Sequence, residues 1–124
     1  MKVQYTRVYS DDDGESHFGR GEMEIKAVDF APPAPPLEIT AFTAVKRLAF
    51  MLIRADWLGS WHPAPRRQFL LLLSGRISCE VSGDGKRRFG QGGIILLEDT
   101  SGKGHVIRSL GVDSLIGVVQ LGQG

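Results

Sequence analysis

The chain has 124 residues, 42% of them hydrophobic and 23% charged, values that are typical of a globular domain and exclude global disorder. Its formal net charge of +1 argues against a dedicated nucleic-acid-binding protein, because such a protein needs a broad basic face. The single cysteine, Cys79, excludes an intrachain disulfide and a cysteine-built zinc site, and it fits a reducing compartment. A chain of this length can bury one hydrophobic core, so we expect a single domain.

The first residues, 1–13, are polar and charged and lack the apolar core of a signal peptide. The longest apolar run, 69–73, is far too short to span a bilayer. We therefore expect a soluble, cytoplasmic protein with neither a membrane nor a nucleic acid as its partner.

Sixteen glycines and six prolines separate short apolar runs, a rhythm typical of a compact all-β domain with tight turns. Between the second and third expected strands, the prolines of segment 31–36 cannot donate ladder hydrogen bonds. This segment is predicted to be an extended crossing that packs against the barrel, with a linker as the alternative. In chain order, we expect strands at residues 3–9, 22–30, 46–54, 68–73, 76–81, 86–89, 94–97, 105–110 and 113–121.

The strand at 68–73 is apolar at every position from Phe69 to Leu73. A strand with one face in water alternates apolar and polar residues, so both faces of this strand are predicted to be buried. The inner face would line the barrel, and the outer face needs a cover from the N-terminal strands or from a second subunit. A homodimer is therefore an expected assembly.

Two motifs in the segment 59–105 carry a resemblance. In the first, His62 precedes Gln68, and Gln68 is followed after six residues by Gly75. The second opens at Gly92-Gly93 and ends at His105. These motifs resemble those of the cupin superfamily, whose members are double-stranded β-helix (jelly-roll) barrels that often hold a metal ion between the two motifs.

The resemblance implies a single cupin-like domain over residues 1–124, with N-terminal strands and the proline-rich crossing in 1–40 and the barrel core in 41–124. The segments 61–69 and 98–105 are similar to motifs of small single-domain bacterial cupins of unassigned activity.

The resemblance also implies a site at the barrel mouth, formed by His62, Gln68 and His105, for one divalent metal (Zn, Fe, Mn or Ni) or for no metal. The usual site has three imidazoles and a carboxylate, whereas here Gln68 stands at the glutamate position and Ala64 at that of a histidine. An amide oxygen is a weaker donor without charge, so an ion would need Glu98 or Asp99 as a further ligand.

Each candidate also has a plainer interpretation. His62 and His105 can instead hold the shape of their loops, and Gln68, if it faces inward, needs a hydrogen-bond partner. Trp57 and Trp61 are candidate ligand-binding residues, or they pack in the core or in an interface.

Glu98 is a further candidate for ligand binding, although with Asp99 it can simply form a turn. Cys79 is predicted to be a small buried hydrophobic residue rather than a nucleophile.

Three functions remain open at this point. The first is a metal-dependent cupin enzyme that acts on a small organic substrate, of dioxygenase, isomerase or decarboxylase type, as the resemblance implies. The second is a non-catalytic module that binds a small molecule. The third is a metal-free sugar isomerase or epimerase with His62 or His105 as the base.

Overall fold

The computed structural model describes residues 1–122. It confirms the all-β class, because the described residues form eleven strands and no helix. No helix long and apolar enough to cross a membrane occurs in residues 1–122. The strands are β1 (Lys2–Ser10), β2 (Ser16–Glu24), β3 (Lys26–Val28), β4 (Leu37–Ile39), β5 (Val45–Ile53), β6 (Gln68–Ser74), β7 (Arg76–Val81), β8 (Gly85–Gly90), β9 (Ile94–Leu97), β10 (His105–Ser109) and β11 (Ser114–Leu121).

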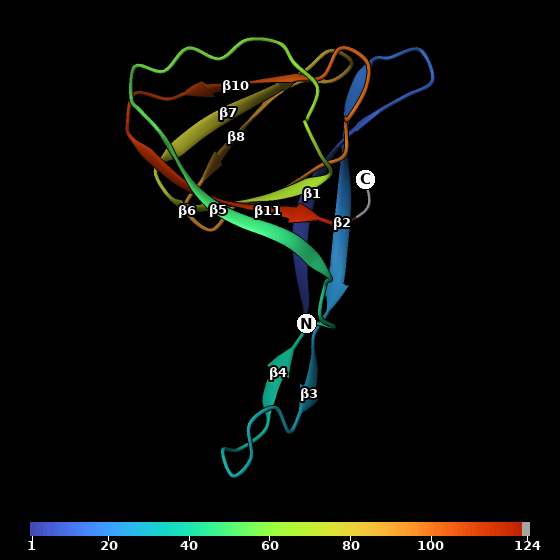
Figure 1. Cartoon of the computed structure of the whole chain (residues 1–124), viewed down its shortest axis with the longest axis vertical. Helices are drawn as coiled ribbons and strands as arrows, with labels where there is room; N and C mark the ends of the chain where they lie inside the picture. Colours follow the sequence, from blue (N-terminus) through green and yellow to red (C-terminus); the bar gives the residue numbers. More distant parts are fainter. Residues whose placement is uncertain (123–124) are drawn as a thin grey trace.

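The strands form three sheets. A six-stranded sheet has the order β2-β1-β9-β6-β11-β5, and it faces a three-stranded sheet of order β10-β7-β8 (Figure 1). The third sheet is the small pair β3-β4, which projects away from the other two (Figure 1). Within residues 1–122 no ladder of hydrogen bonds joins the two large sheets into one closed barrel.

The pairing from β5 to β11 is nested. The innermost pair is the hairpin β7–β8, followed outward by β6–β9, by a single bridge between His62 and His105, and by β5–β11. Every one of these pairs is antiparallel, and the members of successive pairs lie in opposite sheets. This half of the chain is thus one long hairpin folded over into two facing layers, and β1 extends the larger layer by pairing in parallel with β9.

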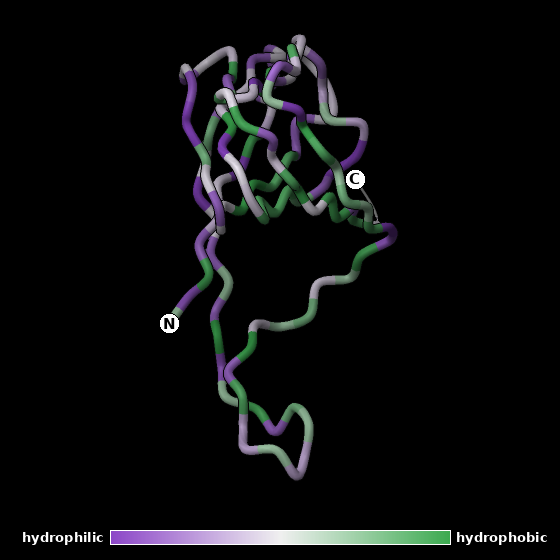
Figure 2. Tube along the Cα trace, turned by 90° about the vertical axis from the view of Figure 1, so that its left-hand side faces the viewer, coloured by the Kyte–Doolittle hydropathy of each residue, from purple (hydrophilic) through white to green (hydrophobic). Residues whose placement is uncertain are grey.

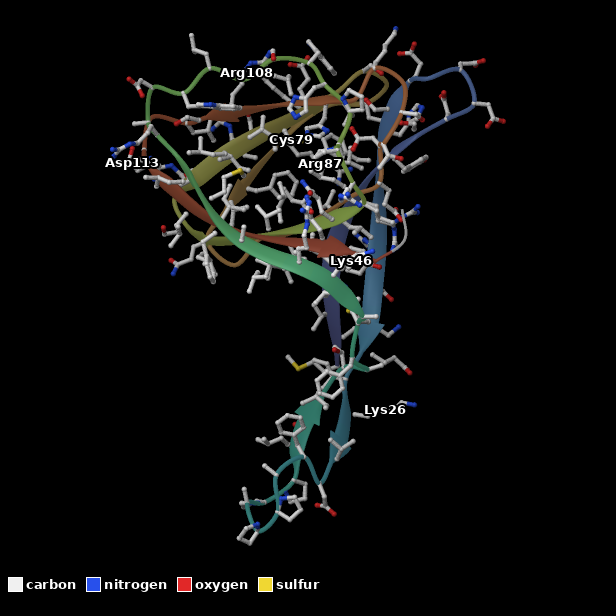
Figure 3. The ribbon with its side chains drawn as sticks, viewed as in Figure 1. Lys26, Lys46, Cys79, Arg87, Arg108 and Asp113 are labelled. Atoms are coloured by element: carbon white, nitrogen blue, oxygen red, sulfur yellow. The ribbon has the colours of Figure 1, made fainter. Side chains whose placement is uncertain are left out.

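The core lies between the two large sheets. Alternate residues of each strand point into it, including Leu70 and Leu72 from β6 and Ile77 and Cys79 from β7. The sulfur of Cys79 lies between the sheets (Figure 3), and burial, aided by the nearby acidic groups, raises the pKa of its thiol to about 12. Cys79 is therefore a buried hydrophobic residue, as predicted, and not a nucleophile.

The other face of the six-stranded sheet, which we call the outer face, is also apolar. At its centre Phe69, Leu96 and Leu121 are buried, and the ring of Tyr5 meets that of Phe69 edge-on at a centroid distance of 5.5 Å. Towards the edge strand β5 the apolar side chains are exposed, and Phe50 is 67% exposed. The prediction that both faces of β6 are apolar and packed holds for its first residues, but β1 and β2 extend this sheet and do not cover it.

The proline-rich segment differs from the prediction. The second strand, expected at 22–30, begins at Ser16 and ends at Glu24. After Ile25, β3 pairs with β4, a strand that was not predicted. Residues 31–36 form the tip of this hairpin and are exposed, so they do not pack against the body of the protein. The reason is that the apolar residues flanking the prolines pair with each other and with no other strand. Residues 25–44, which we call the arm, extend beyond the six-stranded sheet (Figures 1 and 2).

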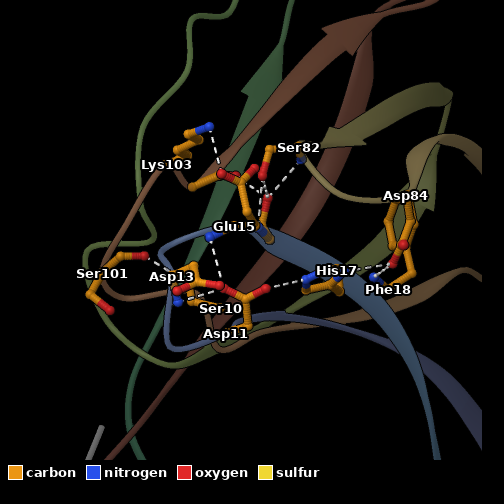
Figure 4. Close-up of polar contacts among 12 residues, drawn as sticks. Ser10, Asp11, Asp13, Glu15, His17, Phe18, Ser82, Asp84, Ser101 and Lys103 are labelled. Carbon is orange, nitrogen blue, oxygen red and sulfur yellow. Dashed lines mark hydrogen bonds and ion pairs between the residues drawn. The ribbon is translucent and has the colours of Figure 1, made fainter.

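Ion pairs attach the turn between β1 and β2 to neighbouring loops (Figure 4). Lys103 pairs with Glu15 at 2.6 Å, and His17 Nε2 lies 2.7 Å from Asp11. His17 Nδ1 lies 3.3 Å from Asp84, so the protonated ring can donate to a carboxylate from each side.

The pH dependence of this cluster is testable. The hydrogen bond to Asp11, followed by that to Asp84, raises the pKa of His17 above 6.5. Because the folded state holds the proton of His17 more tightly than the unfolded state does, protonation stabilises the fold. This stabilisation is complete at pH values below the unfolded-state pKa and is lost as pH rises through the raised folded-state pKa. We expect Asp11→Asn to move the NMR titration midpoint of His17 down towards 6.5 and to weaken the fall in melting temperature above that pH. The control Asp12→Asn should change neither value, and an unchanged midpoint in Asp11→Asn would contradict the assignment.

Candidate functional site in the cavity between the sheets

A cavity of about 280 Å³ opens between the two large sheets. Four predicted site residues, His62, Gln68, His105 and Trp57, line it together. None of the described residues that line it is Asp, Glu, Lys or Arg. The remaining lining residues are apolar: Met51, Leu52, Ile53, Pro65, Leu70, Leu97 and Ile107.

The two histidines are brought together by their backbones. His62 N donates to His105 O at 3.1 Å, His105 N donates to His62 O at 3.0 Å, and the ring centroids lie 5.0 Å apart. Gly104 permits this approach, since it has a φ of +74° and a Cβ there would lie 2.1 Å from His62 O. The predicted convergence of His62 and His105 is therefore present, and it depends on the glycine beside His105.

Hydrogen bonds fix which nitrogen of each ring is protonated. His62 Nδ1 lies 2.8 Å from Ser60 O, and a carbonyl can only accept, so Nδ1 carries the proton. His105 Nδ1 donates to Asp99 Oδ2 at 2.6 Å, and both side chains are at least 99% buried. In the neutral form of each ring Nε2 then carries the lone pair, which can accept a hydrogen bond.

Asp99 has a role that the sequence analysis did not assign to it, since it was considered there only as a turn former or a further metal ligand. It lies behind His105, and its Oδ1 is buried without a hydrogen-bond partner among the described residues. An orphaned buried acceptor costs about 1–3 kcal/mol, so the site retains an uncompensated polar atom. Strand alternation was the available signal, because Leu97 points inward, Glu98 outward and Asp99 inward again.

Gln68 faces inward and has found a side-chain partner. Gln120 Nε2 donates to Gln68 Oε1 at 2.9 Å, while Arg47 donates twice to Gln120 Oε1, at 2.9 and 2.5 Å. These hydrogen bonds give the buried amide of Gln68 a partner, so no ligand is required to satisfy it. The bond from Gln120 also occupies one lone pair of the amide oxygen that was expected to face a metal. The sequence could not reveal it, because only the register of β5, β6 and β11 brings the three residues together.

The remaining two candidates, Glu98 and Trp61, do not line the cavity. Glu98 accepts from Arg7 Nε at 2.7 Å and from Arg67 Nε at 2.9 Å. Burial alone would raise the pKa of Glu98, but the hydrogen bonds from Arg67 and Arg7 outweigh it, and the pKa falls below 4.5. Trp61 borders a separate surface depression beside Lys103.

No group of three or more His, Cys, Asp or Glu side chains that could hold a metal ion occurs within residues 1–122. The cavity offers two imidazoles and one amide that is already hydrogen-bonded. A scan against protein-family models matches no family, and a search of the curated proteins finds no match. The site is therefore interpreted from its own geometry.

The role of Gly104 can be tested with a matched glycine. Gly104→Ala places a Cβ against His62 O, whereas Gly111, at a φ of +85°, has nothing within 4 Å of its Cβ position. Both alanines should lose about 1–2 kcal/mol from backbone strain. Only Gly104→Ala should lose more and shift the imidazole NMR signals of both histidines. Equal losses of unfolding free energy in denaturant would contradict the proposed contact.

The orientation of His105 by Asp99 predicts a tautomer. In the unmodified chain, ¹⁵N chemical shifts should show an unprotonated Nε2 on His105. An Asn at this position can donate to Nδ1, so Asp99→Asn should move the proton to Nε2. Loss of the charged acceptor should lower the unfolding free energy by about 1–3 kcal/mol. A His105 spectrum that is the same in Asp99→Asn would show that Asp99 does not set the tautomer, and the signals of His17 serve as the internal control.

Proposed function

We propose that this chain is a jelly roll of the cupin type, and that its interior cavity binds one small, uncharged and mainly apolar organic molecule. The nested antiparallel pairs from β5 to β11 support the fold assignment, because a jelly roll is two facing sheets formed by such a folded hairpin. The convergence of His62 and His105 in one cavity supports the likeness of the two motifs to those of cupins.

The observation that carries the function is the Nε2 lone pair of His105, held by a buried carboxylate beside an apolar cavity. Asp99 fixes the ring through Nδ1 at 2.6 Å and stabilises the imidazolium that forms when Nε2 takes a proton. His105 can therefore accept a hydrogen bond from a ligand, or remove a proton from it and return the proton to it. His62 adds a second acceptor, at a centroid distance of 5.0 Å.

The lining of the cavity defines the ligand class. A volume of about 280 Å³ is just below the range of about 300–1,000 Å³ for small-molecule sites, so only a compact ligand fits. Because no Lys or Arg lines it, a carboxylate or phosphate would lose its hydration without a cationic partner. A sugar would turn several hydroxyl groups towards apolar side chains, so a compact molecule with one or two polar groups fits better.

Benzyl alcohol and benzoate form a matched pair of probes, since they have similar size and differ in charge. We expect benzyl alcohol to shift the imidazole NMR signals of His62 and His105 at millimolar concentration, and benzoate to bind at least about 10-fold more weakly because its charge is buried unpaired. His105→Phe should remove the hydrogen bond of the alcohol while keeping the cavity apolar. If neither probe perturbs the two rings, or if benzoate binds better, the proposed ligand class is wrong.

A divalent metal is the second candidate, and the free Nε2 atoms of both rings favour it. Two imidazoles on one zinc ion, at Zn–N distances of about 2.0–2.1 Å, place their centroids roughly 5 Å apart, in agreement with the observed 5.0 Å. A carboxylate behind a ligating histidine, as Asp99 lies behind His105, is also common at metal sites. His62 and His105 would hold the ion, with the amide of Gln68 as a weak third donor, and the ion would act as a Lewis acid.

Titration of the chelator-treated protein with Zn²⁺, Fe²⁺, Mn²⁺ and Ni²⁺ tests this candidate. A resident metal requires one ion per chain, and both His62→Gln and His105→Gln should weaken binding by at least about 10-fold, or 1.4 kcal/mol. His17→Gln is the control, because His17 lies at the start of β2 and does not line the cavity. Binding that is unaffected by the two cavity substitutions would reject this candidate and leave the metal-free proposal in place.

A further inference from the structure

We propose that the outer face of the six-stranded sheet and the arm form one continuous surface that binds a second copy of this chain. This inference is independent of the cavity and its ligand. It rests on the exposed apolar side chains of the sheet and the arm, and on their placement on one side of the molecule.

The first part of this surface is the outer face near the edge strand β5. Alternate residues of β5 point outward, and the register places Leu52 opposite Leu115 and Leu48 opposite Val119 on β11. Phe50 lies between them, opposite Gly117, which has no side chain to cover it. This part of the sheet therefore presents an apolar surface that no other segment of residues 1–122 covers. Its most exposed large side chains are Leu48, Phe50, Leu52, Leu73 and Leu115.

The second part is the arm. A groove of about 510 Å³ runs along its base, lined mainly by apolar groups that include Val28, Ile39 and Phe42. Met23 also lines this groove and packs against the buried residues of the outer face, so the two apolar regions are continuous. Both views show the arm extending on the side of the six-stranded sheet, away from the three-stranded sheet (Figures 1 and 2).

The arm lacks the contacts that would hold it in a single chain. It contains two strands of three residues each, and a lone two-stranded hairpin is marginally stable in water. Phe42 is 83% exposed, and its ring lies against the ring of Phe30 at a centroid distance of 6.1 Å. A projecting, apolar hairpin of this kind gains stability when a partner covers it.

The exposed large apolar side chains are concentrated on this surface. Ten of the fourteen found among the described residues belong to the outer face and the arm. A standard interface takes about 800 Å² from each partner, which is roughly a tenth of the 7703 Å² surface of this chain. Glu98 forms ion pairs with Arg7 and Arg67 and so offsets one of their two positive charges. An apolar centre with a polar rim is the composition of a protein interface.

A second copy of the chain can cover this surface without any other molecule being present. In a two-fold symmetric dimer each copy supplies the same surface, so the sheet and arm of one copy meet the sheet and arm of the other. The side chains exposed on the outer face include many large apolar ones, which favour a protein surface as the partner over a nucleic acid or an anionic lipid surface.

Sedimentation velocity over a dilution series of the full chain tests the proposal. We expect the unmodified protein to sediment at twice the mass of the chain at micromolar concentration. Phe50→Asp, on the sheet, and Phe42→Asp, on the arm, should each shift the protein to the mass of one chain. Both side chains are exposed in the single chain, so far-UV circular dichroism should show that the fold persists.

Leu58→Asp is the matched control, because Leu58 is 91% exposed on the loop between β5 and β6 and belongs to neither part of the surface. This variant should remain dimeric. A monomeric unmodified protein overturns the proposal, and so does a full dimer in either of the two aspartate variants. Dissociation of the Leu58→Asp control would also overturn it, since the effect would then not depend on this surface.

Discussion

Both faces of the six-stranded sheet are apolar, and this constraint determines much of the rest of the structure. A sheet of this kind cannot leave either face in water without a large cost in hydration. The three-stranded sheet covers the inner face and creates the core and the cavity. The outer face is buried only at its centre, under Tyr5 and its neighbours. Its apolar side chains near β5 remain exposed, and we propose that a second copy covers them. Site and proposed interface are thus two consequences of one sheet.

Two polar side chains of the cavity are held by partners from other parts of the chain. His105 is held by Asp99, and Gln68 is held by Gln120 and in turn by Arg47. A polar network that is nearly fully satisfied holds its side chains in fixed positions, which is what a binding site requires. The exception, Asp99 Oδ1, is the one buried side-chain acceptor left without a partner among the described residues. This oxygen belongs to Asp99, whose contact with His105 carries the proposed proton chemistry.

The sequence predicted the strands well because the signals are local. Two-residue periodicity and turn glycines located β7 and β9 to the residue and most other strands within two positions. Motif spacing singled out His62, Gln68 and His105, and the structure places them in one cavity together with Trp57.

The failures have a common physical cause, because they depend on partners distant in the chain. The hydrogen-bond chain through Gln120 requires the register of three strands. The sequence analysis predicted a crossing where the arm forms a hairpin. The hairpin was missed because β4 has only three residues, which is too short for a recognisable strand pattern. Glu98 is held outside the cavity by two arginines from segments that lie 60 residues apart in the chain. The motif around Glu98 therefore could not reveal where its side chain lies.

Strand β5 connects the two proposals. Met51, Leu52 and Ile53 contribute to the wall of the cavity, while Leu48 and Phe50 point to the outer face. It is an edge strand, with one side of its backbone unpaired, and edge strands depend on side-chain packing for their order. A partner that covers the outer side would hold the same strand that forms the cavity wall. Thermodynamic linkage then requires reciprocity: if the dimer binds the ligand more tightly than the single chain does, the ligand strengthens the dimer by the same factor.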